Sequence, residues 1–464
     1  MFLDRIVELG VLEREWASNR FSLVVVYGRR RVGKSALLRR FLRGKRGVYY
    51  VAAELPARQL YEELAAVIGE ELGVYVPSDL VEALERLASL GERIVVVLDE
   101  FQYMIEADEG LASRLQRSID SRLSESRLML VLCGSAVSFV EERLLGYRAP
   151  LFGRRSRSIK LRPMRLLEAH GFYRRSESPL EEVAMYSVLG GTPAYARYAT
   201  GAASLEELLE EVLEPGHQLL TEHLDLLRQE VREPRTYLSI LKAVAEGSVT
   251  PGEVAQRSGV DPRNVHHYVS LLESLDILER RLPLGARRGS RLWIRDPYFR
   301  FALTVTPRVQ SLVEAGYRDK AVEIASRLVR ERLMGPTLQQ VVEEHVPELH
   351  EIGVIPTRPV EKGSWWRGDA EIDIVVREPG VSTSFIEVKL SLDSREARRA
   401  LARLEERASR TGLQSPRNYY IVVGGVVEDL EEPVTWLDEH HAIVDYSRVW
   451  EAIVEKYRWR WEEH

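Results

Sequence analysis

Short apolar segments alternate with longer amphipathic segments through the N-terminal part of the chain. The apolar segments are rich in β-branched residues, which predicts buried strands at SLVVVY (22–27), GVYYVAA (47–53), IVVVLDE (94–100) and LMLVLCGS (128–135). The segment from Pro56 to Gly73 has apolar residues at helical spacing. Strands that alternate with helices predict a parallel sheet with helices on both faces, and uniformly apolar strands fit burial on both sides. We therefore predict an α/β core over residues 1–164.

The pattern changes after residue 164, where strand signals stop. Residues 165–232 predict helices broken at GGTP and EPG, which suits a helical lid. Residues 233–300 predict three helices and a β-hairpin, and residues 301–334 a helical linker. Residues 335–464 predict a helix, the strands EIDIVV and SFIEVKLS, an arginine-rich helix and the strand NYYIVVGG. The fold class is thus a multidomain α/β protein with a second, small α/β domain at its C-terminus.

Composition and charge limit the classes of protein to which this chain can belong. Hydrophobic residues make up 45% and charged residues 29%, which indicates a globular chain. The net charge of −6 means that contact with nucleic acid would need a local basic patch. A single cysteine, Cys133, excludes a disulfide scaffold. Because no apolar run reaches the roughly 20 residues of a membrane helix and the N-terminal apolar stretch carries acids, we expect a cytoplasmic protein without a membrane partner.

A glycine-rich segment follows the first predicted strand and precedes a helical pattern. Residues 28–35, GRRRVGKS, match the spacing G-x-x-x-x-G-K-[ST] of a phosphate-binding loop. Backbone N–H groups curl around phosphate oxygens in such a loop, and the helix N-terminus adds positive potential. ATP, ADP and Mg²⁺ are therefore the expected ligands, since the guanine-reading pattern Asn-Lys-x-Asp is absent. The residues expected to bind nucleotide are Gly28, Arg29, Arg30, Arg31, Val32, Gly33, Lys34, Ser35 and Ala36.

Several residues in the loop and in the rest of the α/β core suit the binding and hydrolysis of a nucleoside triphosphate. Lys34 would contact the β- and γ-phosphates, and Ser35 and Asp99 would ligate Mg²⁺. Glu100, at the end of an apolar strand, would polarise the attacking water. Ser135 suits a contact with the γ-phosphate or the water, although a structural Gly-Ser turn fits nearly as well. Arg154, or its neighbour Arg155, suits a γ-phosphate sensor or an arginine finger, and a solvated basic loop is the alternative.

Several of these segments resemble the archaeal ATPase family, a group of P-loop proteins related to the AAA-like and STAND-like ATPases. The matching segments are FLDRIVEL, YGRRRVGKSALLRRF, VVVLDEFQYM, LCGSAVSF, LFGRRS, LGGTPAY and IRDPYFRF. The resemblance implies a P-loop NTPase core that undergoes an ATP-driven conformational change. It also implies a C-terminal domain of the restriction-endonuclease type.

Residues 233–300 predict a winged-helix domain. Thr250-Pro251 and Asp261-Pro262 each combine an N-cap residue with proline at the first helical position, and the second pair opens a helix of the DNA-recognition kind. The side chains expected to reach DNA are Arg263, Asn264 and His267 on this helix and Arg287, Arg288 and Arg291 on the wing. Acidic residues at the far end of the helix leave contact with a protein partner, or self-association, as the alternative.

Two strands of the C-terminal domain carry a pattern similar to that of PD-(D/E)XK nucleases. Asp373 lies on one strand, and Glu387 and Lys389 share a face of the next strand by the period of two. The two carboxylates would bind a second Mg²⁺, and Lys389 would support the attacking water. One departure stands against cleavage: Gln339 occupies the position at which the family often carries a glutamate, with Glu343 one helical turn further on. A salt-bridged domain kept for binding is the alternative.

Three functions are consistent with these observations. The first is an ATP-hydrolysing switch that acts on or regulates DNA through the winged helix. The second is an ATP-gated, Mg²⁺-dependent nuclease. The third is a non-catalytic scaffold that holds nucleotide and binds proteins.

Overall fold

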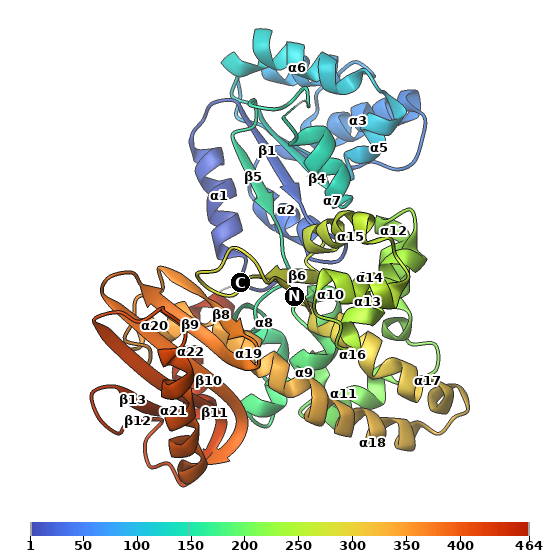
Figure 1. Cartoon of the computed structure of the whole chain (residues 1–464). Coiled ribbons are helices and arrows are strands. Elements are labelled where there is room, and N and C mark those ends of the chain that lie inside the picture. Colours follow the sequence, from blue (N-terminus) through green and yellow to red (C-terminus); the bar gives the residue numbers. More distant parts are fainter. Residues whose placement is uncertain (1, 148, 463–464) are drawn as a thin grey trace. The chain divides into compact units, whose positions relative to one another are not determined.

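The computed structural model describes residues 2–147 and 149–462 (Figure 1). The chain forms two compact units, Met1–Pro163 and Met164–His464. The four segments predicted after residue 164 thus pack together in one unit. Among the described residues, no helix has both the length and the apolar character needed to cross a membrane.

The N-terminal unit is built on a five-stranded parallel sheet, as the sequence pattern predicts, with strand order β2-β3-β4-β1-β5. The strands are β1 (Ser22–Tyr27), β2 (Gly47–Val51), β3 (Val95–Asp99), β4 (Met129–Gly134) and β5 (Arg157–Lys160). The edge strand β5 is not among the predicted strands. Its sequence RSIK buries only Ile159, so it lacks the apolar run that marks the other four.

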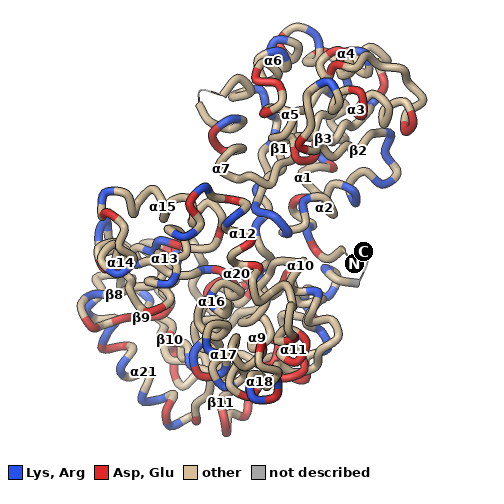
Figure 2. Tube along the Cα trace, turned by 90° about the vertical axis from the view of Figure 1, so that its right-hand side faces the viewer, with Lys and Arg blue, Asp and Glu red and all other residues tan. Residues whose placement is uncertain are grey.

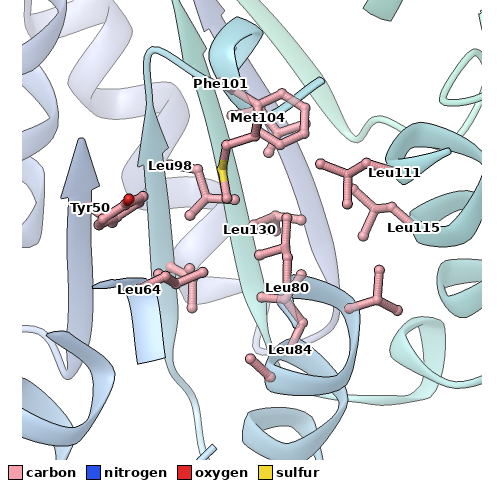
Figure 3. Close-up of a cluster of buried hydrophobic side chains, with 14 of the residues drawn as sticks. Tyr50, Leu64, Leu80, Leu84, Leu98, Phe101, Met104, Leu111, Leu115 and Leu130 are labelled. Carbon is pink, nitrogen blue, oxygen red and sulfur yellow. The ribbon is translucent and has the colours of Figure 1, made fainter. Parts of the chain in front are cut away.

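Helices cover both faces of this sheet. They are α1 (Ile6–Ala17), α2 (Lys34–Leu42), α3 (Ala57–Leu72), α4 (Leu80–Ala88), α5 (Gln102–Ala107), α6 (Leu111–Ser121) and the short α7 (Val137–Phe139). Successive residues of β1 point to opposite faces, so Val24 joins the core under α1 and α2 while Val25 joins the core under α3 to α6. Figure 3 shows the latter core, with Leu64, Leu84 and Leu115 of three helices around strand residues.

The C-terminal unit begins with helices, and its last part contains a sheet followed by two further helices. Its helices are α8 (Leu166–Tyr173), α9 (Pro179–Leu189), α10 (Pro193–Ala196), α11 (Leu205–Val212), α12 (Glu222–Glu230), α13 (Pro234–Ala245), α14 (Pro251–Ser258), α15 (Pro262–Ser274), α16 (Pro297–Thr304), α17 (Thr306–Glu314), α18 (Arg318–Leu328), α19 (Met334–Glu344), α20 (Val346–Glu351), α21 (Ser394–Ser409), α22 (Tyr446–Lys456) and α23 (Trp459–Glu462). The antiparallel hairpin of β6 (Leu278–Arg281) and β7 (Arg291–Ile294) follows α13, α14 and α15.

The six-stranded sheet of this unit is mixed, with order β12-β13-β11-β10-β9-β8. Its strands are β8 (Glu361–Arg367), β9 (Ala370–Glu378), β10 (Ser382–Asp393), β11 (Arg417–Glu428), β12 (Val434–Trp436) and β13 (His441–Asp445). β11 lies parallel to β10 and β13, and the other pairs are antiparallel. The arginine-rich helix α21 packs its apolar side, including Leu401 and Leu404, on one face.

A buried polar network ties the first helices of this unit to the last. Glu182 of α9 accepts a hydrogen bond from Trp450 Nε1 of α22 (3.0 Å), and its other oxygen lies 2.9 Å from His170 Nδ1 of α8. His345 stacks on Trp450 with ring centroids 5.0 Å apart. Because Glu182 is only 2% exposed, these contacts hold the predicted lid segment firmly to the C-terminal sheet domain.

Candidate functional site

The loop between β1 and α2 requires glycine at its two ends. At Gly28, which has φ of 148°, an added Cβ atom would lie 2.2 Å from the carbonyl oxygen of Leu161. Gly33, with φ of 97°, caps α2 in the left-handed region. The first glycine is therefore needed for close packing against the segment after β5, and the second starts the helix whose N–H groups face the loop.

Lys34 is buried at the start of α2, inside the curve of this loop. Its ammonium group donates hydrogen bonds to the carbonyl oxygens of Gly28 (2.7 Å) and Arg29 (3.1 Å). An ammonium group has three N–H donors, so one remains for a ligand. The lysine is thus held in the loop by the backbone that the two glycines shape.

Asp99, at the end of β3, collects hydrogen bonds on both of its oxygens. Ser35 Oγ donates to Oδ2 over 2.7 Å, Tyr49 OH donates to the same oxygen, and the Glu100 N–H donates to Oδ1 (2.9 Å). Burial by itself raises the pKa of Asp99, but hydrogen bonds from Cys133, Tyr49 and Ser35 hold that pKa below its ordinary value. Asp99 is therefore a carboxylate at neutral pH, beside a serine hydroxyl.

Glu100 has a left-handed backbone, with φ of 53°, which is uncommon for a residue with a side chain. Its carboxylate accepts hydrogen bonds from Ser135 Oγ at the end of β4 (2.6 Å) and from the Gln102 amide. The ends of β3 and β4 thereby bring together Glu100 and Ser135, which the sequence predicts as neighbours of the γ-phosphate. Strain at such a position is common at functional sites.

Arg5 holds the outside of the loop, and sequence reasoning assigned it no role. It lies just before α1 with 6% of its surface exposed. Its guanidinium donates to the carbonyl oxygens of Val32 (3.0 Å) and Arg162 (2.8 Å) and pairs with Glu8 (3.1 Å). The loop is thus fixed from both sides, by Lys34 within and by Arg5 outside. Tyr49 and Gln102 are the other site neighbours that sequence reasoning missed.

Comparisons with known proteins agree with this geometry. The model of a family described as "ATPase domain predominantly from Archaea" matches residues 2–198. An ATP-binding protein of Methanocaldococcus jannaschii, MJ0423, is 50% identical over 46 residues, which span 10% of this chain and 78% of that protein. The chain carries an archaeal-type P-loop ATPase domain.

Other similarities extend beyond this domain. A second family model, of archaeal and bacterial proteins of unknown function, matches residues 298–400 of the ATPase. Protein MJECL04 of M. jannaschii is 27% identical over 93% of this chain and 97% of its own length. The solved structure of the Walker-type ATPase PABY2304 of Pyrococcus abyssi has a TM-score of 0.52 and 22% identity over 65% of this chain and 96% of its own. That structural likeness shows a shared fold.

The remaining loop residues of the ATPase differ in exposure. Arg29 and Val32 are buried, Arg30 is half-buried, and Arg31 and Ala36 are exposed. Arg31 has φ of 70°, so the loop turns through the left-handed region at a residue with a long side chain. The loop therefore presents a mixture of packed and accessible side chains.

Arg154 makes a bidentate ion pair that sequence reasoning did not foresee. Its Nε and Nη2 atoms each lie 2.8 Å from a carboxylate oxygen of Asp120 on α6. The same guanidinium donates to the carbonyl oxygens of Pro150 and Phe152. In this structure Arg154 is engaged by its own unit, and it would have to leave Asp120 to reach a phosphate.

The residues predicted to contact DNA occupy two places on the C-terminal unit. Arg263, Asn264 and His267 are exposed at the N-terminal end of α15, and Arg287 and Arg288 are exposed in the loop between β6 and β7. This arrangement leaves all five side chains accessible to a ligand.

Arg291, the sixth predicted DNA contact, is already engaged. It pairs with Glu371 of β9 (2.9 Å), and its guanidinium lies over the Trp366 ring, 4.8 Å from the centroid. Its charge is thus partly neutralised within the protein.

The C-terminal domain brings Asp373 and Glu387 together as the sequence predicts. Burial, and then the negative charge of Glu387, raise the pKa of Asp373 to about 6. Glu387 pairs with Lys389 (2.7 Å) and with Arg407 of α21 (3.0 Å). Across the described residues, no group of three or more Asp, Glu, His or Cys side chains is placed to hold a metal ion. Both cations contact Glu387, so this carboxylate is already engaged in ion pairs within the protein.

Neither Gln339 nor Glu343 adds a third carboxylate to the Asp373–Glu387 pair. The side-chain amide of Gln339 donates a long hydrogen bond to the backbone carbonyl of Asp373 (3.4 Å). Glu343 pairs with Arg281 of β6 (3.2 Å). Gln339 therefore neighbours the site as a neutral group, and Glu343 serves an ion pair with the hairpin.

Proposed function

We propose that the protein is an ATP-hydrolysing molecular switch whose C-terminal unit acts on DNA. The observation that carries the proposal is the arrangement at the ends of β1, β3 and β4. There, a buried lysine, a serine–aspartate pair and a glutamate on a strained backbone surround one phosphate-binding loop. ATP hydrolysis requires a phosphate-binding loop, a lysine such as Lys34, a Mg²⁺-binding carboxylate such as Asp99 and a residue such as Glu100 that positions water.

The residues present fit a magnesium ion. Mg²⁺ prefers oxygen ligands, and the Ser35 hydroxyl and Asp99 carboxylate oxygens lie 2.7 Å apart. When bound there, Mg²⁺ would neutralise charge on the β- and γ-phosphates. Tyr49 would keep the Asp99 carboxylate oriented, because its hydroxyl donates to the same oxygen as Ser35.

Within this proposal, Glu100 orients the water that attacks the γ-phosphorus. The hydrogen bonds from Ser135 and Gln102 fix the carboxylate and leave it acceptor capacity for a water proton. Lys34 uses its third N–H for a phosphate oxygen of the leaving group. Attack by the water oxygen forms the new oxygen–phosphorus bond of inorganic phosphate and breaks the bond from the γ-phosphorus to the bridging oxygen, which leaves with ADP, while Glu100 accepts the proton of the water.

Two substitutions test the switch. Lys34→Ala is expected to abolish Mg·ATP binding, measured by calorimetry. Glu100→Gln is expected to bind Mg·ATP like the wild type and to lower turnover by about 10²–10⁴-fold, the usual contribution of a general base. Glu106→Gln, an exposed glutamate of α5, is the matched control and should keep full turnover. Unchanged turnover in Glu100→Gln would remove its role, and binding without any wild-type turnover would favour the scaffold function.

The coupling to DNA is supported by the order of elements after residue 233. Three helices precede a β-hairpin, and the exposed side chains of Arg263, Asn264 and His267 lie at the start of the third helix. This is the order of a winged helix, whose third helix contacts base edges. Titration of a labelled duplex with and without Mg·ATP tests the coupling. We expect nucleotide to change the affinity; equal affinity in all states would refute a switch that acts on DNA.

A Mg²⁺-dependent nuclease is a second candidate function. The observation in its favour is that Asp373, Glu387 and Lys389 lie together at adjoining strands, as nuclease chemistry requires. The pairing of Glu387 with Arg407 and the neutral Gln339 stand against it. Plasmid cleavage with Mg²⁺ or Mn²⁺ that is lost in Asp373→Ala and retained in Asp369→Ala would establish the activity. The absence of cleavage in every nucleotide state would leave the domain as a binder.

A further inference from the structure

The hairpin loop, residues 282–290 between β6 and β7, is attached to the edge of the C-terminal sheet. The N–H of Leu284 donates to the carbonyl oxygen of Ser364 on β8 (2.8 Å), and Trp366 Nε1 donates to the carbonyl oxygen of Gly289 (3.1 Å). The Leu284 side chain packs against the core that α21 shares with the sheet. The loop is therefore held by two hydrogen bonds to its backbone and by the packing of Leu284, and it forms a fixed part of the surface of this domain.

Glu371 of β9 links this loop to the carboxylate pair. Its side chain pairs with Arg291 at the base of the hairpin (2.9 Å), while its backbone carbonyl accepts a hydrogen bond from Arg407 of α21 (2.7 Å). The other end of the same guanidinium contacts Glu387 (3.0 Å). The hairpin, the carboxylate pair and α21 are therefore consecutive parts of one surface.

Helix α21 continues this surface with a row of arginines. Arg395, Arg399 and Arg403 precede Arg407 at intervals of four residues, so they follow one side of the helix. We call these three residues the arginine strip. Their side chains are exposed and form no ion pair or side-chain hydrogen bond within the described part of the chain. Figure 2 shows the basic positions along α21.

The acidic residues of α21 are occupied elsewhere. Glu396 closes the capping box at the start of the helix, Glu405 lies 3.5 Å from His441 Nε2, and Glu406 pairs with Arg410. The arginine strip is thus left with uncompensated positive charge, although the whole chain has a net charge of −6. A local basic row on an acidic protein indicates a polyanionic partner.

We propose that the arginine strip and the hairpin loop together bind the phosphate backbone of duplex DNA, with the Asp373–Glu387 pair between them. The proposal rests on the proposed action on DNA and names the surface that performs it. Arginine spacing of four residues corresponds to about 6 Å along a helix, and α21 extends for about 24 Å, the length of roughly seven base pairs. Guanidinium groups match phosphate oxygens in a bidentate manner. Arg287 and Arg288 continue the path at the exposed hairpin loop.

Binding of a labelled 30-base-pair duplex to the full-length protein, followed by fluorescence anisotropy at several salt concentrations, tests this surface. The strip variant is Arg395→Gln/Arg399→Gln/Arg403→Gln, and glutamine keeps helix propensity at exposed positions. The matched control is Arg174→Gln/Arg175→Gln/Arg332→Gln, three exposed arginines outside the proposed surface. Circular dichroism confirms that each variant is folded.

We expect the strip variant to bind about tenfold more weakly or worse, and the slope of log affinity against log salt to fall by about 2.7, for three phosphate contacts of about 0.9 each. Arg287→Gln/Arg288→Gln should lower the slope by about 1.8, and the control variant should match the wild type.

Three results would overturn the assignment. In the first, the strip and hairpin-loop variants bind the duplex like the wild type, whereas Arg263→Ala/Asn264→Ala/His267→Ala loses binding. This result would place DNA on α15 and leave the proposed action on DNA intact. Absence of duplex binding by the wild type in every nucleotide state would remove both proposals. Displacement of the duplex by polyglutamate at equal charge would indicate an acidic protein partner instead of a phosphate backbone.

Discussion

Arg5 provides a direct test of whether the phosphate-binding loop is held from outside. Its guanidinium donates to the carbonyl oxygen of Val32 within the loop at 3.0 Å and to that of Arg162 at 2.8 Å, and Arg5 itself is not among the residues proposed to touch nucleotide. Arg5→Met keeps an apolar stem of similar length and removes all donors. The substitution therefore separates the support of the loop from contact with the ligand.

The expected magnitude follows from the bond to Val32. A hydrogen bond from a charged group contributes about 1.5–3 kcal/mol, and its loss leaves a buried carbonyl oxygen without this donor. If that free energy favours the binding-competent loop, its loss lowers the competent fraction and raises the apparent Kd for Mg·ATP. At 1.4 kcal/mol for each factor of ten, the increase is about tenfold to a hundredfold.

Calorimetric titration of Mg·ATP measures this effect. Arg5→Lys should lie between the wild type and Arg5→Met, because one ammonium group cannot reproduce the fork that reaches two carbonyls. Arg14→Met, an exposed arginine on α1, is the control and should bind like the wild type. A folded Arg5→Met protein with wild-type affinity would refute the reasoning, since the loop would then keep its shape without this support.

Two further predictions concern backbone space and pH. Gly28→Ala places a Cβ atom 2.2 Å from the Leu161 carbonyl oxygen, at a backbone φ of 148°. We therefore expect the free energy of unfolding to fall by about 2–5 kcal/mol and Mg·ATP binding to weaken. An unchanged urea midpoint would contradict this expectation. The pKa of Asp373 is about 6 in the folded protein, above the ordinary value of 3.8. The stability of the folded state is therefore highest with respect to this group below about pH 4, where it is protonated in both states, and that stability is lost as the pH rises through 6. Asp373→Asn, neutral like the protonated acid, should therefore raise the urea midpoint more at pH 8 than at pH 5. The same gain at both pH values, or an equal gain in the control Asp369→Asn, which changes an exposed aspartate, would count against this reasoning.

The sequence predicted those parts of the fold that depend on local pattern. The strands β1 to β4 carry uniformly apolar runs, and the loop motif lies directly between β1 and α2, so periodicity and spacing suffice for both. Arg5 escaped prediction because its partners lie 27 and 157 residues away, and nothing in its neighbours marks the contact. Tyr49 likewise reaches Asp99 only because β2 and β3 pair in register.

The C-terminal site shows the same limit. The period of two correctly places Glu387 beside Lys389, with a contact of 2.7 Å. The contact of Arg407 with Glu387 depends on how α21 packs against the sheet, and that of Arg291 with Glu371 depends on where the hairpin docks. Both are tertiary contacts, and they turn two predicted functional groups into parts of an ion-pair network.

The buried network around Glu182 constrains how a nucleotide signal can travel. The sequence pattern predicts a lid over residues 165–232, yet Glu182 of α9 contacts both His170 of α8 and Trp450 of α22. Removing the partners of a buried charge costs about 3–5 kcal/mol, so opening α9 away from α22 is costly compared with moving them together. We therefore expect α8, α9 and α22 to stay together in every nucleotide state. The C-terminal unit, including the hairpin loop and the arginine strip, would then keep its internal spacing.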